Sequence, residues 1–337
     1  MALPVPRLTE RPTQGPLVDR FGRAHTYLRL SVTDRCNYRC VYCMPIRGFA
    51  WAPREHLLTF DEIARLVRIF AGMGVSRVRL TGGEPLVRRG LTGLVRQVAA
   101  LPGIDEVNLT TNGHLLADHA QALADAGLTR VNVSMDTLDP ERFRAITRGG
   151  TLERVLAGIA AARAAGLSPL KINVVVVAGE NDGEIEGMVD WARQHAATTQ
   201  LRFIEYMPFD APLQRHVTEA SLRERLRARF DMRPLNARQG GGPATHWQLD
   251  DGLIVGFISA MSEHFCEACN RLRLQCNGDL RTCLSRDDSP NLRDTLRSGA
   301  DDDAVEQLIR SMVWGKVAGH EAHLGRAFEG TMTKVGG

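Results

Sequence analysis

The sequence predicts an α/β fold, specifically an incomplete (βα)6 TIM-like barrel followed by a smaller C-terminal domain. Three patterns predict it. Six short β-branched segments alternate with longer amphipathic ones, glycines end several of the longer segments, and polar residues or glycines follow nearly every short one. Repeated βα units require a parallel sheet with right-handed crossovers. A dinucleotide-binding sheet is disfavoured because no GxGxxG follows the first strand. Polar strand ends favour a barrel, whose sites gather side chains from several strands.

The six βα units run from residue 25 to residue 230. Thr59 and Glu62 form a capping box before the first helix, and Gly74, Gly127 and Gly166 end three helices. Because a closed barrel has eight strands, six predict one that stays open at the side. The expected strands are 25–33, 76–83, 105–113, 130–136, 171–179 and 199–208, and the expected helices are 59–74, 91–101, 114–127, 151–166, 184–195 and 221–230.

The rhythm of the chain changes at both ends of these units. Residues 1–22 contain four prolines and little to bury, which predicts a flexible N-terminal arm before a barrel of residues 23–207. Beyond Pro208 the chain has a glycine-rich stretch, an expected hairpin over 246–259 and a second group of cysteines. Residues 208–330 are therefore expected to form the smaller domain, with 331–337 as a tail.

Composition excludes several classes of protein. With 44% hydrophobic and 24% charged residues in 337, the chain is typical of a globular protein. Its longest apolar run, 174–178, is far too short to span a membrane, and its N-terminus does not resemble a secretory signal, so we expect a cytoplasmic protein. A net charge of +3 gives no reason to expect nucleic-acid binding. In a reducing compartment, seven cysteines point to metal chemistry.

The first group of cysteines follows the first strand as C-x3-C-x2-C, formed by Cys36, Cys40 and Cys43. A structural zinc site needs four ligands, and no fourth Cys or His lies in this loop. Three thiolates on an iron–sulfur cube would leave one iron open to a small molecule. With an aromatic residue before the third cysteine, this motif resembles the signature of the radical S-adenosylmethionine (SAM) enzymes.

The RLTGGEP segment, residues 79–85, resembles the glycine-rich segment that contacts the amino group of SAM in that family. Gly82 and Gly83 allow close backbone approach, and Glu84 offers a carboxylate to an ammonium. Alone, the segment is also compatible with an ordinary strand-to-helix turn.

The second group contains Cys266, Cys269, Cys276 and Cys283. Asn277-Gly278 predicts a two-residue hairpin turn, which would bring Cys283 back opposite Leu272 and leave Cys276 beside the turn. We therefore expect Cys266, Cys269 and Cys283 to form a second three-thiolate set, with a four-cysteine zinc site as the alternative.

Both cysteine groups together, with FCEACNRLRL and the final Gly336-Gly337, resemble the GTP 3′,8-cyclase family of molybdenum cofactor biosynthesis over about Leu17 to Gly337. The resemblance implies a lyase with two 4Fe-4S clusters, one on each three-cysteine set, and with SAM and GTP as ligands. The SAM contacts that it implies are Tyr42, Gly83, Ser134 and Met207. The GTP contacts that it implies are Arg29, Arg79, Thr110, Lys171, Arg271, Leu272 and Arg273, and strand alternation adds Arg202 as a candidate.

For two of these cations, Lys171 and Arg202, a role other than GTP binding stays open. Lys171 is notable because the chain has 3 lysines against 39 arginines, yet it begins a strand, whereas barrel sites favour strand ends. Arg202 is either a substrate contact or part of an ion pair at the core edge.

The resemblance also implies a mechanism and partners. A 5′-deoxyadenosyl radical takes the ribose 3′ hydrogen of GTP, and the resulting carbon radical attacks guanine C8. Arg271 and Arg273 are expected to stabilise the intermediate. A mobile tail ending in Gly336 and Gly337 is expected to enter the site. The implied partners are a flavodoxin or ferredoxin as electron donor, a second copy in a homodimer, and cyclic pyranopterin monophosphate synthase, which takes the product.

Two other hypotheses remain at this stage. A two-cluster radical enzyme acting on peptide or RNA would be expected to carry a recognition segment, which is not visible in the sequence. A zinc-dependent binding protein could hold two cysteine groups without catalysis.

Overall fold

The computed structural model describes residues 8–44, 50–207, 215–235, 242–263, 265–284 and 290–319. None of the helices in these ranges is long and apolar enough to cross a membrane.

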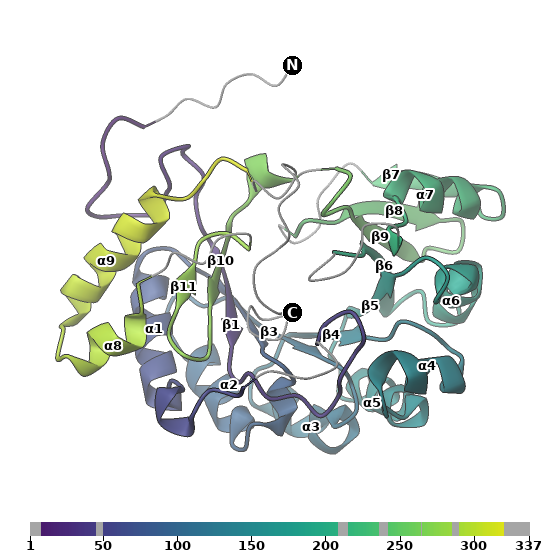
Figure 1. The fold of residues 1–337 in the computed structure, drawn as a ribbon, viewed down its shortest axis with the longest axis horizontal. Helices are drawn as coiled ribbons and strands as arrows, with labels where there is room; N and C mark the ends of the chain where they lie inside the picture. Colours follow the sequence, from purple (N-terminus) through teal and green to yellow (C-terminus); the bar gives the residue numbers. More distant parts are fainter. Residues whose placement is uncertain are drawn as a thin grey trace.

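One curved, mostly parallel sheet organises the described chain (Figure 1). Its strand order is β11-β10-β1-β2-β3-β4-β5-β6-β9-β8-β7. Because β11 and β7 are the two ends of this order, the barrel is not closed, as the sequence predicts. The strands are β1 Tyr27–Ser31, β2 Arg77–Thr81, β3 Glu106–Thr111, β4 Arg130–Ser134, β5 Leu170–Val176, β6 Thr199–Glu205, β7 Met232–Leu235, β8 Thr245–Leu249, β9 Ile254–Ile258, β10 Arg271–Leu274 and β11 Leu280–Arg281.

The six predicted βα units are confirmed. Thr59 and Glu62 form the expected capping box, and Gly74, Gly127 and Gly166 all have positive φ beyond helix ends. Within the six units, one α-helix, α4, was not predicted. The α-helices are α1 Phe60–Gly72, α2 Leu91–Ala99, α3 Leu116–Asp125, α4 Pro140–Thr147, α5 Leu152–Ala164, α6 Ile185–Arg193, α7 Glu219–Arg227, α8 Leu292–Arg297 and α9 Asp302–Trp314, and the 3-10 helices are η1 Arg54–His56, η2 Pro85–Val87, η3 Asp182–Glu184 and η6 Cys266–Ala268.

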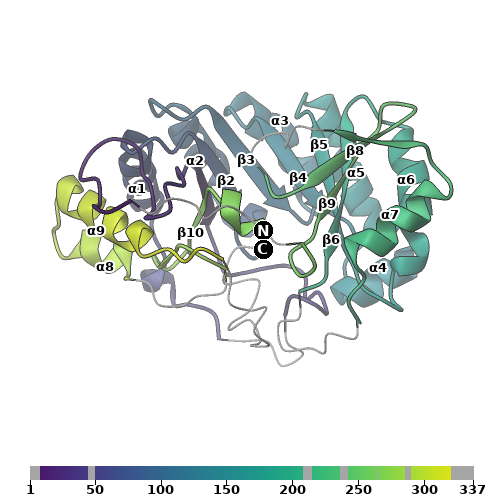
Figure 2. The same ribbon diagram turned by 90° about the horizontal axis from the view of Figure 1, so that it is seen from above.

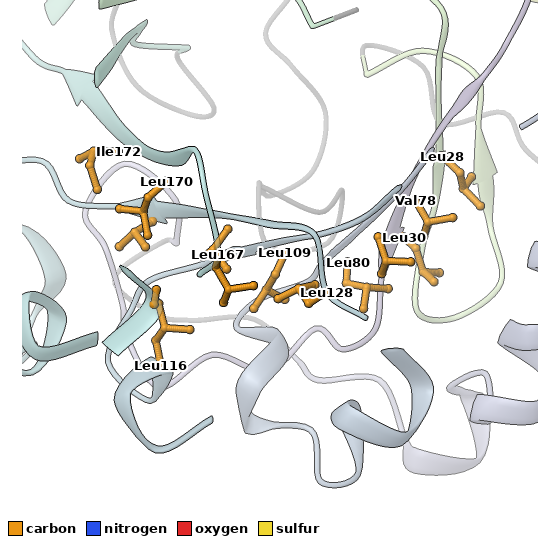
Figure 3. Close-up of a cluster of buried hydrophobic side chains, with 14 of the residues drawn as sticks. Leu28, Leu30, Val78, Leu80, Leu109, Leu116, Leu128, Leu167, Leu170 and Ile172 are labelled. Atoms are coloured by element: carbon orange, nitrogen blue, oxygen red, sulfur yellow. The ribbon is translucent and has the colours of Figure 1, made fainter. Parts of the chain in front are cut away.

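The sheet has one apolar and one polar face. In β1 and β2, the leucine and valine side chains are fully buried on the side of the helices, where Figure 3 shows Leu28, Leu30, Val78 and Leu80 together. Successive side chains of a strand point to opposite faces, so the residues between them line the inner face. The hydrophobic core therefore lies between sheet and helices and leaves the inner face for polar chemistry.

The C-terminal segment extends this same sheet at both edges. Strand β9 pairs in parallel with β6, and β10 pairs in parallel with β1. Viewed from above, α8 and α9 lie beside α1 at one edge and α7 lies beside α6 at the other (Figure 2). The described part of the expected C-terminal domain thus adds strands to the barrel sheet, and the boundary at residue 208 stays a prediction.

The expected flexible arm is wrong for its described part, residues 8–22. Leu17 is 1% exposed, and its N–H donates to the carbonyl of Met73 at 2.8 Å. Arg310 of α9 donates to the carbonyl of Gly15 at 2.7 Å. The proline content predicted flexibility, although the segment packs. It packs because Leu17 and Asp19 reach the core, and both residues are buried.

The hairpin of β10 and β11 forms, but its loop is one residue longer than predicted. Arg273 pairs with Arg281, and the Gln275 N–H donates to the Asp279 carbonyl at 2.8 Å, so Cys276, Asn277 and Gly278 form the loop. Gly278 has φ 97°, the left-handed conformation that three-residue hairpin loops require. The register is shifted by one residue, and Cys283 is not opposite Leu272.

We predict that Leu17→Ala lowers the free energy of unfolding by about 2–5 kcal/mol, because it empties a buried site. Urea unfolding with an unchanged m value measures the effect. Leu8→Ala, at a leucine 41% exposed in the same segment, serves as the control and should change stability by less than about 0.5 kcal/mol. Equal effects of the two variants would contradict a packed arm.

Candidate functional site

Cations from neighbouring strands gather on the inner face. Arg29 of β1 is in register with Arg273 of β10 on one side and with Arg79 of β2 on the other. Further along the sheet, Lys171 is in register with Asn132, and Arg202 with Asn173. We call Arg29, Arg79, Lys171, Arg202 and Arg273 the cationic inner face.

These cations are held in an unfavourable environment. Burial, with the neighbouring cations, lowers the pKa of Arg202 to about 9 and that of Lys171 to about 7. Burial, opposed in part by Tyr27, also lowers the pKa of Arg29 to about 10. The Nε and Nη2 atoms of Arg202 are buried and donate no hydrogen bond to the described residues. Because buried unpaired charge is strongly unfavourable, this face suits a ligand with several negative charges.

Tyr27 organises part of this face and was not among the predicted site residues. Its hydroxyl accepts a hydrogen bond from Arg79 Nε, and the Arg79 guanidinium lies 5.8 Å from the centre of its ring. A second nitrogen of Arg79 is 3.4 Å from the hydroxyl oxygen of Thr110, a predicted GTP contact on β3. The Arg202 alternative of a core-edge ion pair receives no support, since no carboxylate of the described residues lies within ion-pair distance of it.

The first cysteine loop follows the carboxyl end of β1. The N–H groups of Cys43 and Met44 both donate to the Cys40 carbonyl at 3.0 Å, which folds the loop into a tight turn. The Cys36 sulfur accepts the Tyr38 N–H at 3.4 Å and lies 3.9 Å from Asn112 Nδ2. Burial raises the pKa of Cys36 to about 11. Burial also raises the pKa of Cys40, and the nearby Cys43, Asp136 and Cys36 raise it further. Cys40 thus lies close enough to Cys43 and to Cys36 for their thiolates to disfavour its own.

The GGEP segment packs directly against the base of this loop. The Gly83 N–H donates to the Thr33 carbonyl and the Glu84 N–H to the Arg35 carbonyl, each at 2.8 Å. A Cβ on Gly83 would lie 2.3 Å from the Arg35 carbonyl oxygen, so only glycine fits. The glycines therefore allow the backbone of the GGEP segment to lie close to the backbone at the base of the cysteine loop.

Glu84 has a structural task that the sequence did not reveal. Its carboxylate is 1% exposed and accepts hydrogen bonds from the N–H groups of Leu86 and Asn112 and from the Thr111 hydroxyl. Burial raises its pKa to about 7, although these hydrogen bonds oppose the shift. These hydrogen bonds hold β3 to the turn after β2, and the expected contact of Glu84 with a ligand ammonium stays a prediction.

The predicted SAM contacts lie at the carboxyl ends of different strands. Tyr42 donates to Asp136 Oδ2 at 2.5 Å, and Asp136 also accepts the Val175 N–H at 2.8 Å. Ser134 is the last residue of β4, and Met207 lies two residues beyond β6. The fold brings these residues to the end of the sheet where the first cysteine loop begins.

The second cysteine set lies at the opposite end of the paired strands β1 and β10. Cys266 begins η6, and the Cys269 N–H donates to its carbonyl at 3.1 Å, two residues before β10. Burial raises the pKa of Cys269, but the Lys316 ammonium and the Arg271 guanidinium outweigh burial and lower it to about 6. Cys269 and Cys283 both act electrostatically on Lys316 and on Arg273.

Four predicted residues need separate mention. Leu272 is fully buried and in register with Leu28, so its side chain belongs to the core and not to the inner face. Strand alternation turns this side chain away from Arg271 and Arg273, and the contact of Leu272 with GTP stays a prediction. Cys276, expected to be a spare, is 4% exposed, and burial raises its pKa to about 12. Gly336 and Gly337 lie outside the described residues.

Two further buried residues, Arg23 and Lys316, contact the second cysteine set and were missed. Arg23 donates to the Cys266 carbonyl at 2.8 Å, and Lys316 Nζ lies 3.5 Å from the Cys269 sulfur. The rarity of lysine, which singled out Lys171, is the signal that could have found Lys316. Among the described residues, no three His, Cys, Asp or Glu side chains are gathered as a site for a single metal ion.

The comparisons with known proteins agree on one family. Residues 30–192 match the Radical SAM superfamily, and residues 199–322 match Molybdenum Cofactor Synthesis C. The GTP 3′,8-cyclase of Hydrogenovibrio crunogenus is 46% identical over 301 residues, which is 87% of this chain and 90% of that protein. The chain belongs to the GTP 3′,8-cyclase family of radical SAM enzymes.

Other relatives support this membership in sequence and in fold. The GTP 3′,8-cyclase of Mycobacterium sp. (strain KMS) is 47% identical over 315 residues, 92% of this chain and 89% of that protein. The solved structure of Streptococcus suis SuiB bound to precursor peptide SuiA superposes with a TM-score of 0.61 at 14% identity, over 87% of this chain and 66% of that one. This second likeness concerns the fold alone.

Membership of the radical SAM superfamily implies SAM and a 4Fe-4S cluster. The donor set of the first cysteine loop fits such a cluster, because burial and the neighbouring Cys43 and Cys36 disfavour the Cys40 thiolate, and the positive charge of iron would offset this effect. The assignment of this cluster to Cys36, Cys40 and Cys43 stays a prediction.

We predict that Gly83→Ala weakens SAM binding by at least about ten-fold and reduces the iron held by the first loop. The added methyl group must push the Arg35 carbonyl away, which separates the GGEP turn from the cysteine loop and destabilises it by about 1–3 kcal/mol. Anaerobic equilibrium dialysis and iron analysis measure both effects.

The control is Gly93→Ala in α2, where a Cβ meets nothing within 4 Å. This variant should bind SAM normally and gain up to about 1 kcal/mol of stability from helix propensity. Normal SAM affinity in Gly83→Ala would show that the close approach is dispensable.

Proposed function

We propose that this protein cyclises GTP to (8S)-3′,8-cyclo-7,8-dihydroguanosine 5′-triphosphate, the first step of molybdenum cofactor biosynthesis. One observation carries the proposal. Arg29 and Arg273 are paired on β1 and β10, and the two cysteine sets flank these strands at opposite ends. A polyanion bound by the cationic inner face would therefore lie between the two sets. The relatives named GTP 3′,8-cyclase supply the identity of that anion.

The cationic inner face provides the kinds of donor that a triphosphate needs. Arginine presents a planar fork that matches phosphate oxygens, and lysine adds a compact charge. Arg202 offers two buried nitrogens that have no described acceptor. Binding a triphosphate would satisfy these donors and offset the repulsion among the cations, so ligand binding should also stabilise the fold.

The first cluster and SAM supply, when bound, the 5′-deoxyadenosyl radical that takes the ribose 3′ hydrogen. The chain itself orients the reactants. Tyr42, Gly83, Ser134 and Met207 are the proposed SAM contacts, and Arg29, Arg79, Thr110, Lys171 and Arg202 are the proposed GTP contacts. The fixed register of the strands holds these contact residues in fixed positions. A substrate bound by them has one orientation, so it reacts at one carbon.

A second 4Fe-4S cluster on Cys266, Cys269 and Cys283 is part of the proposal. The donor set fits, because Lys316 and Arg271 lower the pKa of Cys269 against the effect of burial and so favour the thiolate that iron binds. Arg271 and Arg273 are proposed to stabilise charge that develops on the substrate.

Other parts of the proposal rest on family resemblance alone. They are the entry of Gly336 and Gly337 into the site, a homodimer, a cytoplasmic location, a flavodoxin or ferredoxin as electron donor, and transfer of the product to cyclic pyranopterin monophosphate synthase.

The decisive experiment is anaerobic incubation of the full chain with dithionite, SAM and GTP. We expect 5′-deoxyadenosine to form while GTP disappears in parallel, measured by liquid chromatography. The purified protein should be brown and hold about eight irons, four for each 4Fe-4S cluster.

Two results would contradict the proposal in different ways. Formation of 5′-deoxyadenosine without any loss of GTP would remove GTP as the substrate. An iron content of about four per chain, unchanged when Cys269 is replaced by alanine, would remove the second cluster.

We also predict that GTP binding weakens as the pH rises from 7 to 8.5. Free Lys171 has a pKa of about 7 because of burial and the neighbouring cations, so it loses its proton over this range. GTP favours the ammonium form, and each binding event must then take up a proton, which weakens affinity up to ten-fold per pH unit. Calorimetry in buffers of different ionisation enthalpy measures both affinity and proton uptake.

Lys171→Met should flatten this pH dependence and weaken binding at pH 7 by about ten-fold, or 1.4 kcal/mol. The control is Arg193→Met on α6, which removes a cation paired with Asp251 away from the inner face. Ionisation of GTP itself is common to all three proteins. An identical pH dependence in Lys171→Met and in the unmodified chain would exclude Lys171 from binding.

A further inference from the structure

Lys316 is a buried lysine that the proposed reaction does not use. It lies two residues beyond the end of α9 and is 3% exposed. Its Nζ is 3.5 Å from the Cys269 sulfur and donates to the Arg271 carbonyl at 2.8 Å. One ammonium thus contacts both a cysteine of the second set and the first residue of β10.

The segment that carries Lys316 is fixed from its other side by Arg23. This guanidinium donates to the carbonyls of Cys266, Val317 and Ala318 at 2.7–2.8 Å. Arg23 is itself held by Asp19, whose carboxylate is buried and lies 2.6 Å from Arg23 Nε. The ammonium of Lys316 is therefore anchored relative to the cysteine loop and is not a surface charge that happens to be nearby.

The choice of lysine at this place is unusual for the chain. Only 3 lysines occur beside 39 arginines, and the two within the described residues are both buried. A lysine ammonium is a compact charge with three donors, so it can serve a sulfur and a carbonyl from one small volume. The longer, planar guanidinium cannot replace it without displacing one of these contacts.

We propose that Lys316 is a positioning residue that raises the reduction potential of the cluster on Cys266, Cys269 and Cys283. The inference rests on the proposed function, which places that cluster there. One-electron reduction adds a negative charge to the cluster and its thiolates. A buried cation with an N–H directed at one ligand sulfur stabilises the reduced form more than the oxidised form.

Arg271 does not make Lys316 redundant. Its Nη2 lies 3.9 Å from the same sulfur, farther than Lys316 Nζ, and its guanidinium is 4.8 Å from the centre of the Phe265 ring. Lys316 is also anchored by a carbonyl of the cysteine-bearing segment, so its charge stays with the cluster whether or not substrate is bound.

The test is a redox titration of the full-length chain in which Cys36, Cys40 and Cys43 are replaced by alanine. Electron paramagnetic resonance then reports only the cluster of the second set. We expect Lys316→Met to shift the midpoint potential to a more negative value, and Lys316→Arg to shift it less. Iron content and thermal unfolding are measured on the same samples.

The matched control is Arg310→Met. Arg310 is also 3% exposed and lies on α9, but it contacts Glu306 and the carbonyl of Gly15 and not the cysteine set. A more negative midpoint potential that appears in Lys316→Met and not in Arg310→Met supports the inference. An unchanged potential in Lys316→Met, or an equal change in both variants, overturns it.

Failure of the proposed function gives a different result. If the chain with the three alanines holds no iron even with Lys316 intact, the second cluster itself is absent. That outcome is read from the starting protein, before any Lys316 variant is compared, and it overturns both the second cluster and the role given to Lys316.

Discussion

The parallel pairing of β1 with β10 is the constraint on which the site depends. It joins a strand near the N-terminus to one more than two hundred residues later, in a register that sets Arg29 beside Arg273. The first cysteine loop follows β1, whereas Cys266 and Cys269 precede β10 and Cys283 follows the antiparallel return strand β11. The same pairing therefore separates the two sets along one direction of the sheet. A one-residue slip of β10 would turn Arg273 toward the core while Arg29 stays on the inner face.

The sheet must both stabilise the fold and hold buried cations, and it uses a different face for each. On the helix side, fully buried residues such as Leu28 and Leu80 supply the hydrophobic stabilisation. On the inner side, the sheet holds cations whose pKa values are lowered by burial and by one another. Such an arrangement lowers the stability of the free protein and raises its affinity for a polyanion, which is the compromise expected at a functional site.

Most of the fold was predictable because the βα rhythm is local. Hydrophobic periodicity, the capping box at Thr59 and the helix-ending glycines gave all six units of the barrel. The errors came where distant residues decide. Leu17 is buried because it packs against the barrel. The hairpin loop includes Cys276 because Gly278 adopts a positive φ. Leu272 was predicted as a GTP contact together with Arg271 and Arg273, although strand alternation points its side chain to the opposite face of the sheet.

The sequence by itself determined the chemistry: three cysteines after the first strand, a second set near the C-terminus, and a polar residue at the end of most strands. These are matters of residue type and spacing, which the chain displays directly. Only the tertiary structure decided that Glu84 braces the chain, that the C-terminal strands complete the barrel sheet at both edges, and that Lys316 meets Cys269. These outcomes depend on contacts between residues far apart in the chain. Such residues come into contact, and contribute free energy by their burial, only when the strands have paired.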